Sequence, residues 1–66
     1  MINVTLKAVK EEIKQDADLK DAPKVVVGHA IKQFVRLVED DNRYAMTDKS
    51  KQAILKYAEG LVNVGK

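Results

Sequence analysis

The sequence predicts a mainly helical fold with three helices, at about residues 6–16, 22–41 and 48–62. Two observations predict it. Apolar residues recur every three or four positions in each segment, and residues that typically start helices precede the second and third segments. The chain has 66 residues, a length that suits one domain, so we expect residues 1–66 to form a single small helical domain.

The first predicted helix carries one apolar face with spacings of three and four residues. Its members are Leu6, Val9, Ile13 and Ala17. Before this helix, apolar and polar residues alternate, which is typical of a short, half-buried strand over residues 2–6. Leu6 fits both patterns, so the boundary between strand and helix is expected anywhere from Val4 to Ala8.

The second predicted helix follows an acidic loop that ends at Asp21. An Asp cap with Pro23 in the first turn is a typical helix start. Residues 24–28 also fit a strand with a glycine turn, because three consecutive valines favour a strand, but the start signal favours the helix. The apolar stripe of this helix is broad, which implies contacts on two sides. It comprises Val26, Val27, Ala30, Ile31, Phe34, Val35, Leu37 and Val38.

The third predicted helix follows a connector at residues 42–46. Thr47 is expected to be its N-cap, with Asp48 in the first turn and Gly65 placed to end the helix. One apolar face runs along it. That face comprises Ala53, Ile54, Tyr57, Ala58, Leu61 and Val62.

The composition argues against an enzyme. There is no cysteine, and His29 is the only histidine, with no acidic residue at helical spacing on either side. Adjacent carboxylates such as Glu11 and Glu12 point in different directions on a helix, so they form no acid–base pair. We therefore expect no catalytic residues, no metal, no cofactor and no small-molecule substrate.

Charge and hydropathy limit the compartment and the partners. No apolar stretch approaches the length of a membrane span, and the N-terminus lacks the pattern of a signal peptide, so a cytoplasmic location without membrane contact is expected. The net charge of +2 permits nucleic-acid binding without demanding it. A core this small is marginal, and oligomerisation is a common way to enlarge it, so we expect a homodimer.

The second predicted helix carries the candidate protein interface. Its broad apolar stripe is followed by a run of three acidic residues at the C-terminal end, where the helix dipole disfavours negative charge. Such a run either improves solubility or docks on a basic partner surface. The candidate interface residues are Val26, Ala30, Phe34, Leu37, Glu39, Asp40 and Asp41.

At its N-terminus the chain resembles the ribbon-helix-helix DNA-binding proteins. Apolar Ile2, Val4 and Leu6 alternate there with polar Asn3, Thr5 and Lys7. The resemblance covers residues 1–38 and implies a short strand that pairs with the same strand of a dimer partner and enters the DNA major groove. It implies base contacts from Asn3, Thr5 and Lys7, and a phosphate contact at the start of the second helix, near Lys24.

Two functional hypotheses follow. The first is a small dimeric DNA-binding regulator of transcription of the ribbon-helix-helix type. The alternative is a small helical protein–protein interaction module, such as an inhibitor, an adaptor or an assembly component that binds a larger protein. The conformation of residues 2–7 is expected to discriminate between them.

Overall fold

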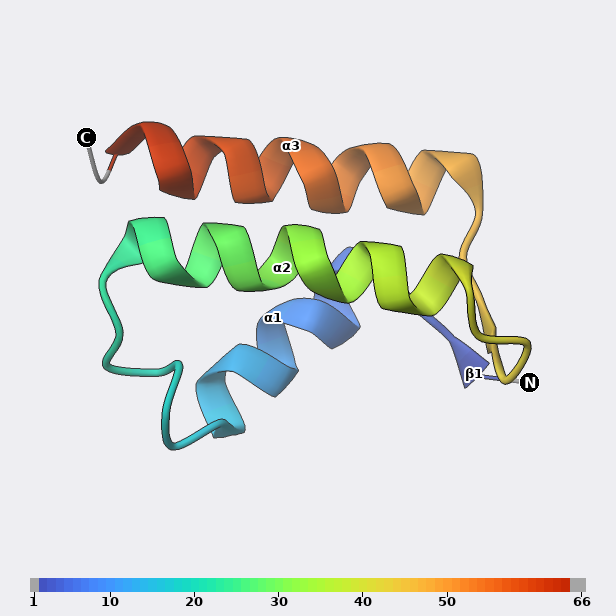
Figure 1. The fold of residues 1–66 in the computed structure, drawn as a ribbon, viewed down its shortest axis with the longest axis horizontal. Coiled ribbons are helices and arrows are strands. Elements are labelled where there is room, and N and C mark those ends of the chain that lie inside the picture. The colour runs from blue at the N-terminus through green and yellow to red at the C-terminus, as the bar shows by residue number, and fades with distance from the viewer. Residues whose placement is uncertain (1, 65–66) are drawn as a thin grey trace.

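The computed structural model describes residues 2–64 and contains three helices and two very short strands. In chain order they are β1 (Ile2–Asn3), α1 (Leu6–Gln15), α2 (Lys24–Glu39), β2 (Tyr44–Ala45) and α3 (Asp48–Val64). Figure 1 shows α2 and α3 side by side, with α1 crossing beside them. The mainly helical class and the three helices are confirmed. Gly65, the predicted end of the third helix, lies outside the described residues.

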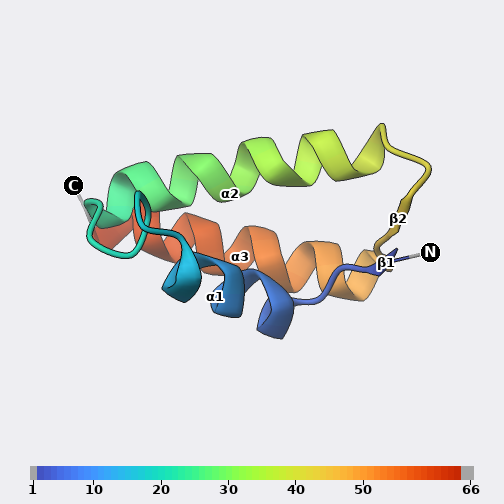
Figure 2. The same cartoon turned by 90° about the horizontal axis from the view of Figure 1, so that it is seen from below.

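Helices α2 and α3 form an antiparallel hairpin that holds most of the core (Figures 1 and 2). Its buried side chains come from the predicted apolar faces. They are Val27, Ile31, Val35 and Val38 of α2, and Ile54, Ala58 and Val62 of α3. At Gly28 the two helices lie too close for a side chain. A Cβ atom at this position would lie 2.6 Å from Val62 Cγ2 and 2.8 Å from the carbonyl oxygen of Ala58. Gly28 lies within α2 rather than in a glycine turn.

Helix α2 starts two residues later than predicted. Pro23 is its N-cap, with no side-chain capping bond, and Asp21 does not cap it. The ring of Pro23 disfavours helical backbone at the preceding residue, so Ala22 cannot begin the helix. Ala22 is instead held in a turn by a bond from its N–H to the carbonyl of Leu19. The helical interpretation of residues 24–28 is confirmed.

The N-terminal strand is shorter than the predicted range of 2–6. Thr5 is the N-cap of α1, because its Oγ1 accepts a bond of 3.2 Å from the N–H of Ala8, so Thr5 and Leu6 belong to the start of the helix rather than to the strand. Strand β1 pairs in parallel with β2 of the same chain. The N–H of Ile2 donates to Arg43, and the N–H of Val4 donates to Ala45.

Helix α1 ends at Gln15, so Ala17 does not extend its apolar face as predicted. Asp16 is the C-cap, and its Oδ1 accepts bonds from the N–H groups of Asp18 and Leu19. This local side-chain turn competes with helical hydrogen bonding and stops the helix. Ala17 is exposed as a result.

Helix α1 packs against α3 and makes almost no close backbone contact with α2. Figure 2 shows α1 on the α3 side of the hairpin. Lys10 of α1 lies over the ring of Tyr57 in α3, 4.9 Å from its centroid. At the start of α3, Thr47 Oγ1 accepts a bond of 3.1 Å from the N–H of Ser50, which confirms the predicted cap. The one-sided docking of α1 leaves the side of α2 that faces α1 incompletely covered.

Candidate protein-binding groove

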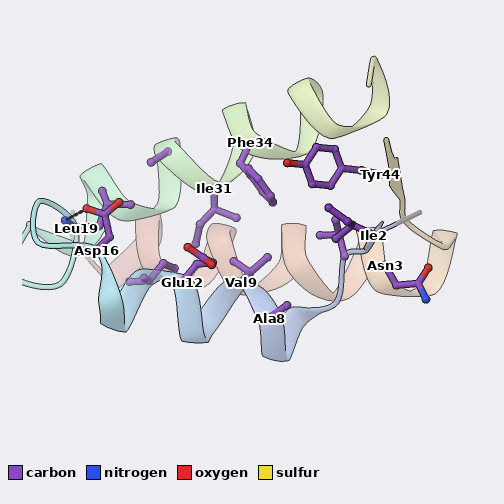
Figure 3. Close-up of a pocket in the computed structure, with 13 residues that line it drawn as sticks. Ile2, Asn3, Ala8, Val9, Glu12, Asp16, Leu19, Ile31, Phe34 and Tyr44 are labelled. Carbon is purple, nitrogen blue, oxygen red and sulfur yellow. Dashed lines mark hydrogen bonds between the residues drawn. The ribbon is translucent and has the colours of Figure 1, made fainter. Parts of the chain in front are cut away.

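An apolar groove with a volume of about 420 Å³ lies between α1 and α2 and is open to solvent. Figure 3 shows Val9 and Ala8 on the α1 side, Ile31 and Phe34 on the α2 side, and Tyr44 with Ile2 at one end. Leu19 lies at the other end. A groove of this composition favours contact with an apolar surface.

The groove combines a floor of buried side chains with exposed apolar side chains along its sides. Val4, Val9 and Ile31 belong to the buried core and form its base. Phe34 is 36% exposed and Ile2 is 57% exposed, so these two side chains remain available to a partner. Because the residues of the floor belong to the core, the groove is already formed before a partner binds.

A stripe of exposed apolar side chains on α2 extends the groove. Val26 is 48% exposed and Leu37 is 69% exposed, and both lie at helical spacing from Ala30 and Phe34 in the groove wall. From Val26 to Leu37 the stripe covers eleven helical steps, about 16 Å along the helix axis. The structure therefore brings together the four apolar residues that the sequence singled out as an interface, and it adds the groove beside them.

The three acidic residues of the predicted interface differ in the contacts that they make within the chain. Glu39 pairs with Lys51 of α3 at 2.9 Å, and Asp41 binds the guanidinium of Arg43 through two oxygens, at 2.7 to 3.2 Å. Side-chain and backbone hydrogen bonds from Arg43 lower the pKa of Asp41, and the same side-chain bond raises the pKa of Arg43. Within residues 2–64, Asp40 makes no side-chain hydrogen bond or ion pair.

The four residues predicted to contact DNA lie in different local settings. Asn3 is on β1 and exposed at the end of the groove, while Thr5 caps α1 through its hydroxyl. Lys7 is exposed on α1, and Lys24 is exposed at the start of α2. In this chain Asn3, Thr5 and Lys7 do not form one face of a strand, because the strand ends before Thr5.

Several groove residues were not singled out as an interface from the sequence, among them Glu12, Ile2 and Tyr44. Glu12 was considered only as part of a surface pair, Ile2 was predicted to face inward, and Tyr44 lay in an unassigned connector. Figure 3 shows the Glu12 carboxylate directed into the space between α1 and α2. No local pattern marks these positions, since the groove arises from the direction in which α1 crosses the hairpin.

A metal centre and a membrane-spanning helix are both missing from the described residues. Among residues 2–64, no group of three or more His, Cys, Asp or Glu side chains is placed to hold a metal ion. None of the described helices combines the length and the apolar character needed to cross a membrane. Comparison with models of known protein families, with curated proteins and with solved structures found no match.

Proposed function

We propose that this chain is a small protein-binding module whose α1–α2 groove receives an apolar helical segment of a partner protein. The observation that carries the proposal is the open groove with Phe34 in its wall, continuous with the exposed stripe of Val26 and Leu37. Contiguous exposed apolar surface on a small soluble domain is typical of an interaction site.

The shape of this surface favours a helix over a small molecule. Pockets for small ligands enclose most of the ligand surface, whereas this groove is open and borders a stripe about 16 Å long. A helix laid along a groove buries residues at spacings of three and four, and about three turns would match the stripe from Val26 to Leu37. The proposal corresponds to the second of the two hypotheses from the sequence.

The DNA-binding hypothesis and the homodimer stay predictions. The DNA hypothesis depends on Asn3, Thr5 and Lys7 sharing one strand face. Here the Thr5 hydroxyl oxygen instead accepts the capping bond from the N–H of Ala8 at the start of α1, and β1 pairs with β2 of its own chain. The groove has more support because Ile2 and Phe34 are already exposed in it, without any rearrangement of the fold.

The test is selection of binders from a displayed library of helical peptides of about 14 residues, which span about 20 Å. Affinity for the selected peptides is then measured by fluorescence anisotropy. Truncation of an anchor side chain at an interface typically costs 2 kcal/mol or more, so Phe34→Ala should weaken binding by about thirtyfold. Val64→Ala is the matched control, because Val64 is 67% exposed on α3 and does not line the groove.

Two results would refute the proposal. One is failure to select any peptide that binds the folded chain. The other is a set of peptides whose affinity falls equally with Phe34→Ala and Val64→Ala. Circular dichroism of both variants is recorded alongside, so that loss of binding is separated from loss of helix.

A further inference from the structure

The charged side chains that line the groove are all acidic. They are Glu12, which follows Ala8 by about one turn of α1, and Asp16, the C-cap residue of the same helix. Lys7, Lys10 and Lys14 of α1 do not line the groove. The apolar groove therefore has a negative edge on its α1 side.

The two carboxylates differ in how far the fold already engages them. Asp16 Oδ1 accepts bonds from two backbone N–H groups in the turn that ends α1. Glu12 makes no side-chain hydrogen bond or ion pair within residues 2–64, and its carboxylate is directed into the groove. Glu12 is thus the group best placed to receive a cation from a bound segment.

The basic side chains of α2 do not compensate for this edge. Lys32 pairs with Glu59 of α3, and neither Lys32 nor Arg36 lines the groove. On the α2 side the groove is lined by Ala30 and Phe34, with Ile31 in its base, and none of the three carries a charge. A helix bound in the groove would therefore meet negative charge along one flank and apolar surface along the other.

We propose that the segment received by the groove is an amphipathic helix with a Lys or Arg flanking its apolar face, placed opposite Glu12. This inference rests on the proposed function. The apolar face of the helix contacts Ile31 and Phe34, and its cation pairs with the Glu12 carboxylate at the edge. Electrostatic complementarity of this kind selects partners and fixes the register of binding.

A second copy of this chain fits the groove less well. In a twofold dimer each patch meets the same patch of its partner. Dimerisation centred on the groove would therefore bring Glu12 and Asp16 toward the same carboxylates of the other copy. Repulsion between these carboxylates opposes association of two copies, whereas the basic side chain of a bound helix would be attracted to them.

The experiment measures the charge preference of the groove. A displayed helical library keeps its apolar positions fixed and allows Lys, Glu or Ser at the flanking positions. The best basic binder and its Lys→Glu counterpart are then titrated against the wild-type chain, Glu12→Lys and Glu11→Lys. Glu11→Lys is the matched control, because it makes the same change of charge at the neighbouring position, outside the groove.

We expect Lys to be enriched at the flank and the Lys→Glu peptide to bind the wild-type chain more weakly, by up to about fivefold, which is the upper end of the range for an exposed ion pair. Glu12→Lys should reverse this preference, and Glu11→Lys should preserve it. High salt should reduce the difference, since the screening length falls to about 3 Å at 1 M.

The outcomes separate the two proposals. Binders without a charge preference, or a preference unchanged by Glu12→Lys, overturn the basic-helix inference and leave the groove as a binding site. Failure to select any binder overturns the proposed function as well. A wild-type dimer in sedimentation that becomes a monomer with Phe34→Ala assigns the groove to a second copy and also overturns the inference.

Discussion

Replacement of Gly28 by alanine tests the close approach of α2 and α3 at residue 28. The added Cβ atom would lie 2.6 Å from a methyl group of Val62 and 2.8 Å from the carbonyl oxygen of Ala58. Neither neighbour yields easily, because valine has a restricted χ1 angle and the carbonyl belongs to the backbone of α3. The helices must therefore move apart to accept the methyl group.

Two opposing effects set the size of the change. Alanine favours the interior of a helix over glycine by about 1 kcal/mol. Overpacking a well-packed core costs about 1–3 kcal/mol, and a contact with backbone belongs at the upper end of this range. We expect Gly28→Ala to lower the free energy of unfolding by about 1–2 kcal/mol in total.

Gly60 supplies a matched control in the same hairpin. It lies within α3, and a Cβ atom there would meet nothing within 4 Å. Gly60→Ala should therefore raise the free energy of unfolding by about 1 kcal/mol through helix propensity alone. The difference between the two variants isolates the steric effect.

Urea titration followed by circular dichroism at the helical band measures both variants. For a domain of this size each kcal/mol corresponds to about 4–8 °C in Tm, so thermal melts provide a second measurement. Equal stabilisation by Gly28→Ala and Gly60→Ala would show that α2 and α3 do not approach as closely at residue 28 as the structure has it.

Three further predictions concern the start of α1, the core and the β2 turn. Thr5→Ala should lower stability by about 1 kcal/mol while Thr5→Ser preserves it, since only alanine removes the capping oxygen; equal urea midpoints would contradict the cap. Ile54→Val should cost about 1 kcal/mol, because Ile54 is fully buried, and an unchanged unfolding curve would place it outside the core. Arg43 holds the pKa of Asp41 below its ordinary value of 3.8, so the stabilisation is complete above that value and is lost as the pH falls through the lower folded-state pKa. Melts from about pH 2 to pH 5 should show a larger loss of stability in the wild-type chain than in Asp41→Asn, in which only the other carboxylates titrate.

Local sequence signals predicted much of the secondary structure. The Thr47 cap, the apolar spacing of the first helix and the apolar face of the third helix all rest on interactions within a few residues. The errors also have local physical causes. Pro23 restricts the backbone of Ala22 and delays α2, and the side chain of Asp16 forms a turn that ends α1 before Ala17.

The sequence predicted the α2 side of the candidate site but not its α1 side. Val26, Ala30, Phe34 and Leu37 stood out because the apolar stripe was wider than one helical contact requires. The opposite wall did not stand out, because Glu12 reads as an ordinary surface carboxylate on an amphipathic helix. Its position in the groove depends on contacts between α1 and α3 that are distant in the chain.

By itself the sequence determined the helical class and the apolar faces, since these follow from hydrogen bonding and spacing along a single segment. Only the tertiary structure decided which parts of those faces are covered. Because Gly28 has no side chain, α2 can approach α3 closely at this position. Helix α1 docks on α3 and leaves Phe34 at the edge of an open groove. Packing of this kind depends on the geometry of all three helices together, which no local pattern encodes.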